Sequence, residues 1–240
     1  MESSAALQVF DCTETWEAVW NAEQPPTKSR VSLRTFREIA HFVGGALSTA
    51  GFRLFQNGGT PLLERHCGAL RQEILLVPAP NFASRPDLPF AIHVHLSNAE
   101  LARVRARYWR PASRAPQAVA GGDLGQLVSP SRRLLFYGCM GLETAQLAAS
   151  LTLEHAIPWL GAFESRTGLK NRLYAEDLAL VDHCTALELL LAEFDPYEAR
   201  RYLRVKMRDV KWESGPIAEP EGFTLLQDRL RPITSYYKLR

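Results

Sequence analysis

Hydrophobic positions recur along the chain with two different periods, and these periods separate an early region of strands from a later region of helices. Between residues 52 and 97, apolar residues occupy alternate positions in short segments separated by Gly and Asn turns, which is typical of an antiparallel meander. Beyond residue 142 they recur every three or four positions, which indicates amphipathic helices. The pattern predicts an α+β fold: an antiparallel β-sheet packed with helices, followed by a helical C-terminal part.

The clearest predicted strand lies in residues 90–97, where side chains of opposite character alternate. Aromatic and aliphatic side chains fill the even positions from 90 to 96, whereas His93 and His95 lie at odd positions. Because successive strand residues project to opposite faces, the two histidines should lie on the face opposite the apolar one. The other predicted strands are residues 7–10, 52–56, 62–67, 70–77 and 132–137.

Capping residues mark where the predicted helices begin and end. The helix that starts at Ser32 should end near residue 50, because Gly51 followed by Phe52 fits a Schellman motif. Asp195 should cap another helix, with Pro196 in its first turn and Glu198 completing a capping box. The remaining predicted helices are residues 98–110, opened by a Ser97-x-x-Glu100 capping box and carrying outward-facing arginines; a helix from about Leu142 that restarts at Pro158; and a helix with Cys184 and Leu187 on its apolar stripe.

Breaks in these patterns predict the domain organisation. A polar segment with Pro25 and Pro26 separates an N-terminal extension, residues 1–30, from an α+β core domain, residues 31–170. Within the core, residues 111–130 are rich in Pro, Gly, Ala and Ser and are predicted to form a long loop. Residues 171–213 are expected to be C-terminal helices packed on the core, and residues 214–240 a C-terminal tail.

Composition agrees with a folded chain that does not enter a membrane. Hydrophobic residues make up 46% and charged residues 22%, an ordinary globular mixture that supports a packed core. The start of the chain has no basic and apolar secretory pattern, and no stretch reaches the length of a membrane span. We expect a cytoplasmic protein whose four cysteines, with no Cys-x-x-Cys pair, are reduced thiols.

Two histidines are the only candidates for metal chemistry. His93 and His95 can point the same way from one strand, with His66 or Glu64 on a neighbouring strand as a third ligand. Two histidines without a further ligand at telling spacing are too few for a site, so we expect no metal and no cofactor. The sequence contains no nucleophile elbow, no phosphate-binding loop and no dinucleotide fingerprint. An enzyme would need a site assembled from dispersed residues such as these three histidines.

The net charge of +2 conceals two strongly basic segments. Residues 100–114 carry five Arg against one Glu, and residues 198–211 carry six basic residues against two acids. At helical spacing these segments form stripes that could bind an acidic protein or phosphates, although solvated helix faces have the same pattern. The candidate partner-binding residues are Arg103, Arg107 and Arg110 with Trp109 beside them, and Arg201, Arg204 and Arg208 on the later helix.

The order of elements from residue 34 to 166 resembles that of a bacterial family known only as a domain of unknown function. The resemblance rests on a helix ending in Gly51-Phe52, a meander, a helix, the stretch from Asp123 to Leu127, a strand, and a helix carrying Pro158-Trp159-Leu160. Such proteins more often look lysine-rich where this chain has Arg53-Leu54. Members of this kind lie beside toxin genes and are suspected immunity proteins, and the family offers no active site to transfer.

Three functions are compatible with these observations. The resemblance implies a protein-binding module, specifically an immunity protein that neutralises a cognate bacterial toxin. The Arg stripes leave open a nucleic-acid-associated protein, which would bind with steep salt dependence. The dispersed histidines leave open an enzyme with an unrecognised site.

Overall fold

The computed structural model describes residues 6–11, 33–57, 60–79, 87–108, 118–129, 131–175, 181–206 and 226–239. The chain folds into two compact units. Unit 1 comprises Met1–Leu96 and Gly121–Ala162, and unit 2 comprises Ser97–Ala120 and Phe163–Arg240. Helices and an antiparallel sheet occur together, so the predicted α+β class is confirmed.

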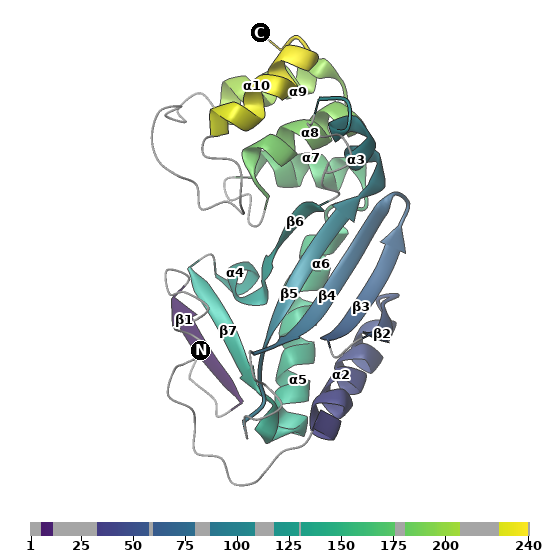
Figure 1. Ribbon diagram of the computed structural model, residues 1–240, viewed down its shortest axis with the longest axis vertical. Coiled ribbons are helices and arrows are strands. Elements are labelled where there is room, and N and C mark those ends of the chain that lie inside the picture. Colours follow the sequence, from purple (N-terminus) through teal and green to yellow (C-terminus); the bar gives the residue numbers. More distant parts are fainter. Residues whose placement is uncertain are drawn as a thin grey trace. The chain divides into compact units, whose positions relative to one another are not determined.

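The framework of unit 1 is a seven-stranded sheet (Figure 1). The predicted meander is confirmed, because β2, β3 and β4 pair antiparallel in chain order. The short N-terminal strand also forms, and it pairs antiparallel with β7 at one edge of the sheet. In sheet order the strands are β1 (Leu7–Asp11), β7 (Arg132–Tyr137), β5 (Pro89–Asn98), β4 (Leu70–Pro78), β3 (Thr60–Cys67) and β2 (Arg53–Asn57), and β6 (Ala118–Asp123) pairs with β5 outside this order.

Helices cover one face of this sheet. Figure 1 shows α2 (Leu33–Ser48), α5 (Leu142–Leu151) and α6 (Ile157–Gly161) on the same side of the strands. The predicted restart at Pro158 is confirmed, because a π-helical turn at Thr152–Ala156 separates α5 from α6 and the proline lies in the first turn of α6. Proline suits that position because the first turn of a helix needs no N–H donor.

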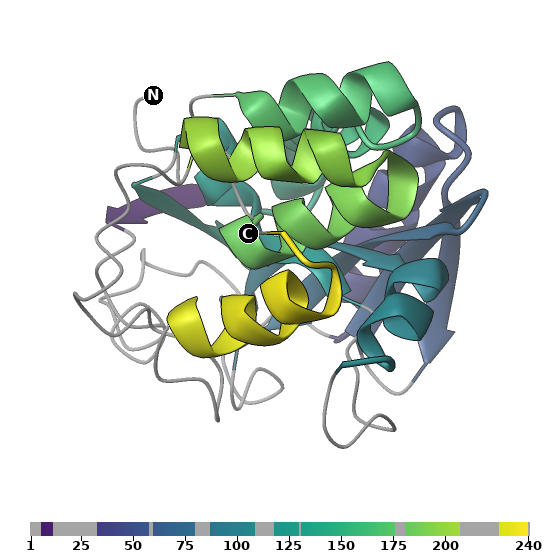
Figure 2. The same cartoon turned by 90° about the horizontal axis from the view of Figure 1, so that it is seen from above.

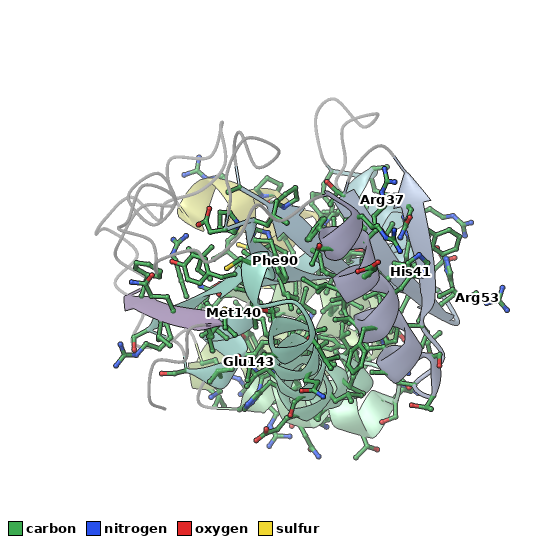
Figure 3. The ribbon with its side chains drawn as sticks, turned by 90° about the horizontal axis from the view of Figure 1, so that it is seen from below. Arg37, His41, Arg53, Phe90, Met140 and Glu143 are labelled. Carbon is green, nitrogen blue, oxygen red and sulfur yellow. The ribbon has the colours of Figure 1, made fainter. Side chains whose placement is uncertain are left out.

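The core of unit 1 lies between the helices and the covered face of the sheet. The Phe90 ring, labelled in Figure 3, lies 5.3 Å from that of Phe36 on α2 and 5.4 Å from that of Phe136 on β7, centroid to centroid. Helix α2 ends as predicted in a Schellman motif: Phe52 N–H donates to Leu47 O at 3.3 Å, and Gly51 has φ +83°. The hydrophobic pattern thus predicted both the buried face of α2 and its end.

The predicted long loop at residues 111–130 is wrong in its second half, which forms strand β6 and helix α4 (Leu124–Val128). The Gly-rich composition of this segment suggested a loop, but Gly121 lies in a strand, where its missing side chain leaves room for a histidine ring. A Cβ at Gly121 would lie 2.6 Å from His95 Nδ1, so only glycine lets the two strands approach this closely. Asp123 then caps α4 in a capping box with Gln126.

Unit 2 is helical, and Figure 2 shows its later helices in green and yellow. Helix α8 is central to the unit, because α3, α7, α9 and α10 all contact it. The predicted start of α9 is confirmed: Asp195 Oδ1 accepts from the N–H of Tyr197 at 2.7 Å and of Glu198 at 3.1 Å. The helices are α3 (Ala99–Arg105), α7 (Arg166–Tyr174), α8 (His183–Glu193), α9 (Pro196–Lys206) and α10 (Leu226–Tyr236).

The predicted capping box of α3 is wrong by one residue. Strand β5 continues through Asn98, whose Oδ1 accepts from the N–H of Glu100 at 2.8 Å and of Leu101 at 3.3 Å. Asn98 therefore caps the helix in place of Ser97. The helix also ends at Arg105, earlier than the predicted boundary at Pro111.

The two units divide the chain differently from the predicted domains. Strand β1 comes from the predicted extension of residues 1–30 and pairs within unit 1. Helix α10 lies within residues 214–240, for which the sequence indicates only a tail. No helix among the described residues is long and apolar enough to cross a membrane.

Candidate functional site

The face of the sheet that α2, α5 and α6 leave uncovered carries most of the chemistry of unit 1; we call it the open face. On β5 the even positions pack toward the helices, and Ile92 and Val94 are fully buried. The odd positions hold His93 and His95, which are only partly buried. The prediction that the histidines lie opposite the aliphatic side chains is therefore confirmed.

A charged row crosses the open face from β3 to β4. Arg71 Nη2 lies 2.7 Å from Glu64 Oε2 and 2.7 Å from Glu73 Oε1, and His66 Nε2 lies 2.8 Å from Glu64 Oε1. Partial burial opposes ionisation of Glu64, but the hydrogen bonds from His66 and Arg71 prevail and lower its pKa. Glu64 and Glu73 therefore hold the Arg71 guanidinium in one position, so the charged row is already ordered in the free protein.

An apolar row lies beside the charged row. Phe55 on β2 is directly opposite Leu62 on β3, and Leu62 is directly opposite Leu75 on β4. Leu62 and Leu75 are half-buried, whereas the Phe55 side chain is 41% exposed. Directly opposed side chains on one sheet face lie close together, so the three form a continuous apolar surface.

Two polar groups of unit 1, His93 and Asp123, have strongly perturbed pKa values and are both influenced by the charge of Arg133. Burial lowers the pKa of His93 to about 4, and the charges of His95 and Arg133 act in the same direction. Burial also lowers the pKa of His95, although Glu73 opposes this shift. Both imidazoles are therefore neutral at neutral pH, as expected for bases withdrawn from water.

Asp123 is perturbed in the opposite direction. Its side chain is 4% exposed, and burial raises its pKa to about 7 against the opposing effects of two backbone N–H donors and Arg133. Oδ1 accepts from Gly125 N–H at 2.8 Å and Leu134 N–H at 3.1 Å, while Oδ2 is buried with no partner among the described residues. This carboxyl is therefore part of the framework that holds β6, α4 and β7 together.

The predicted third ligands for a metal at the histidine pair do not join it. His66 and Glu64 lie on β3, and strand β4 separates β3 from β5, so the expectation that they lie on a strand next to the histidines is wrong. His66 and Glu64 contact each other instead. In the described part of the chain, no three His, Cys, Asp or Glu side chains are grouped closely enough to hold a metal ion.

The predicted basic stripes lie in unit 2, and the structure describes them in part. Arg103 and Arg107 are exposed, but α3 ends at Arg105, so Arg107 lies in the turn that follows it. Arg201 and Arg204 are exposed on α9. The predicted residues Trp109, Arg110 and Arg208 lie outside the described residues.

Neighbouring groups already engage two of the stripe arginines. Arg103 Nη1 lies 2.6 Å from Glu100 Oε1. The Arg201 guanidinium lies over the Tyr174 ring, 5.4 Å from its centroid, with Nη1 3.9 Å from Glu198 Oε1. These arginines are less available to a partner than their spacing in sequence suggests.

The prediction that all α3 arginines face outward is wrong for Arg105, which is buried with Glu188 in unit 2. Arg105 Nη2 lies 2.6 Å from Glu188 Oε2, and both side chains are 1% exposed. The Tyr108 hydroxyl donates to the other carboxylate oxygen of Glu188, and burial raises the pKa of that phenol. Glu188 lies within the otherwise apolar run from residue 186 to 191. A carboxylate in such a run is expected to be buried, and a buried carboxylate needs a cationic partner, so the sequence does contain a signal for this pair.

The thiols are unequal in exposure. Cys184 is buried, and Cys67 and Cys139 are half-buried, all three as reduced thiols. Burial raises the pKa of Cys139, so this thiol is less reactive than an exposed one. Cys12 lies outside the described residues.

Comparison with known proteins assigns no family to this arrangement. No family model, no curated protein and no solved structure matches the chain. The open face is therefore the feature of unit 1 that bears most directly on function.

Proposed function

We propose that the chain is a protein-binding module, and specifically a bacterial immunity protein that binds and neutralises a cognate toxin. The observation that supports this proposal is the open face, where the apolar row of Phe55, Leu62 and Leu75 lies beside the charged row held by Arg71. An apolar centre with ordered polar groups at its margin is the usual anatomy of a protein interface.

The two rows differ in what they supply to binding. A partly exposed aromatic side chain such as Phe55 is a good anchor, because a partner can remove its remaining exposed area from water. Arg71 is already held by Glu64 and Glu73, so a partner that contacts it does not have to order a flexible side chain. The apolar row would thus provide affinity and the charged row orientation.

The stripes of unit 2 fit a partner less well. Arg103 and Arg201 already have carboxylates close by, so an acidic partner would have to compete with Glu100 and Glu198 for these guanidinium groups. The nucleic-acid alternative relies on these same residues. For the enzyme alternative, Asp123 is the most perturbed carboxyl of unit 1, but its buried capping role favours a structural function.

The test is complex formation with the protein encoded beside this chain's gene. The two proteins should form a stable complex, and the chain should restore growth of cells that express the neighbour. Phe55→Ala should weaken the complex at least about tenfold, as expected for loss of an aromatic anchor. The matched control is Tyr197→Ala on α9, an aromatic residue that is 62% exposed and lies in unit 2, which should leave binding unchanged.

Two outcomes would contradict the proposal. Equal effects of the two alanine variants would remove the open face from the interface. Purification of the chain with RNA or DNA and without the neighbour, in a complex that Arg201→Glu with Arg204→Glu disrupts, would favour the nucleic-acid alternative.

A further inference from the structure

The free edge of strand β2 is a distinct feature of unit 1. β2 is the last strand of the described sheet, so one side of its backbone has no neighbouring strand there. Arg53, Phe55 and Gln56 on this strand are exposed. At the opposite end of the sheet, β1 is better covered, since Leu7 and Phe10 are buried. Unpaired N–H and C=O groups on an exposed edge are a template for another strand.

Basic groups surround this edge. Arg53 projects from β2 itself, while Arg37 and His41 are exposed on the neighbouring helix α2. Gln56 Nε2 lies 3.2 Å from His41 Nε2, which brings this side of the helix next to the strand. Figure 3 shows the three labelled basic residues on the same side of the unit, with Arg53 extending furthest outward.

No carboxylate in the described part of the chain neutralises Arg37 or Arg53. The nearest acids in sequence and register are already engaged: Glu38 with Arg34 at 2.9 Å, and Glu64 with Arg71 and His66. The edge therefore presents unpaired cations on both sides of an unpaired backbone. A ligand that satisfies both must be extended and acidic.

We infer that β2 binds an acidic, extended segment of the partner protein, which adds to the sheet as a further strand. This inference rests on the proposed function and specifies the partner's chemistry. Side chains of an added strand alternate between the two faces. On the open face they meet Arg53 and Phe55, so a carboxylate and an apolar group fit there; on the other face they meet Gln56, His41 and Arg37, which fit a second carboxylate.

A second copy of this chain is a poorer occupant of the same edge. Pairing of β2 with β2 would bring two sets of Arg37 and Arg53 together, and like charges at an interface oppose binding. An acidic strand has the opposite effect, and its association should weaken as salt rises.

The probe is a synthetic peptide with the repeat Glu-Glu-Val-Glu, which places glutamate and valine in turn on one face of the strand and glutamate on the other. It is titrated into the isotope-labelled full chain and followed by amide NMR. The amides of residues 53–57 should shift. A peptide with lysine in place of glutamate should bind at least about tenfold more weakly, and so should the glutamate peptide to a variant with Arg37→Glu and Arg53→Glu. The control variant Arg204→Glu makes the same kind of charge reversal in unit 2. It should bind the glutamate peptide with the same affinity as the wild type.

A second peptide tests the backbone contact without altering the protein. Methylation of alternate peptide nitrogens retains every side chain but removes the N–H donors along one edge of the peptide. Of the two possible methylation frames, the one that blocks the edge facing β2 should abolish binding and the other should not. Unchanged binding of both methylated peptides, shifts confined to residues outside β2 and α2, or tighter binding of an oligonucleotide at the same amides would each overturn the inference. If the neighbouring protein still binds the Arg37→Glu, Arg53→Glu variant with unchanged affinity, strand addition is wrong while the proposed function stands. If no neighbour binds but the peptide results hold, the proposed function fails and the edge remains an acidic-strand site.

Discussion

Opposite pKa shifts of Asp123 and His93 predict a hidden pH dependence of stability. The pKa of Asp123 rises from 3.8 to about 7 in the fold, and that of His93 falls from 6.5 to about 4. Between about pH 4 and pH 7 the native state retains the Asp123 proton that the unfolded chain has lost, so this group lowers the free energy of unfolding as pH rises. Between about pH 6.5 and pH 4 the imidazole of His93 is protonated in the unfolded chain but neutral in the native state. This group therefore lowers the free energy of unfolding as pH falls.

The two contributions are similar in size and opposite in slope. The Asp123 shift corresponds to about 4 kcal/mol and the His93 shift to about 3 kcal/mol, both as upper limits. They largely cancel between about pH 4 and pH 6.5, where His95 adds to the histidine side. The wild-type chain should therefore show a flatter stability profile than either group alone would produce.

Single substitutions should reveal each slope. Asp123→Asn retains an oxygen for the N–H groups of Gly125 and Leu134 but removes the ionisation. Relative to wild type it should gain stability from about pH 5 to about pH 8, by more than about 1 kcal/mol, because only wild type must bury a charge at the higher pH. His93→Gln removes the opposing group, so its own stability should fall as pH rises through the same range.

Urea unfolding followed by circular dichroism at several pH values measures these differences. The wild type and both variants are compared at each pH, so pH effects shared by all other groups cancel. If the difference between Asp123→Asn and wild type is the same at about pH 5 and about pH 8, the carboxyl is not titrating as its burial implies. A wild-type profile as steep as that of either variant would also refute the cancellation.

Three further predictions test the framework through the denaturation midpoints of designed variants. Asp195→Ala removes the cap of α9 and should cost about 0.5–2 kcal/mol; an unchanged midpoint would contradict the cap. Gly121→Ala should destabilise by about 1–3 kcal/mol through its clash with the adjacent imidazole, whereas Gly45→Ala, in open space on α2, should stabilise by about 0.5–1 kcal/mol. Glu188→Ala should cost about 3–5 kcal/mol because it leaves a buried guanidinium uncompensated, and Arg105→Met combined with Glu188→Leu should recover most of that loss.

Features determined by neighbours in the sequence were the ones that sequence could predict. Gly51 ends α2 and Asp195 begins α9, because each acts on backbone groups within a few residues of itself. The alternation in β5 likewise placed His93 on the open face, since strand geometry alone sets that parity.

Features determined by distant residues could not be predicted in the same way. Gly121 belongs to a strand only because a histidine ring from β5 fills the space of its missing side chain. Arg105 looks like its outward-facing neighbours until Glu188, 83 residues later, is seen beside it. The basic edge at β2 depends on register between strand and helix, which hydrophobic periodicity does not specify.

Because Arg105 and Glu188 lie 83 residues apart in the sequence, the two units should fold in a defined order during translation. Unit 1 draws on nothing beyond residue 162, so it can close while the rest of the chain is still being synthesised. The segment from residue 97 to 120 is made before that point but belongs to unit 2. The Arg105 guanidinium must remain solvated until Glu188 on α8 has left the ribosomal exit tunnel. A nascent chain halted just short of residue 188 should therefore contain the folded sheet of unit 1 and an incompletely folded unit 2.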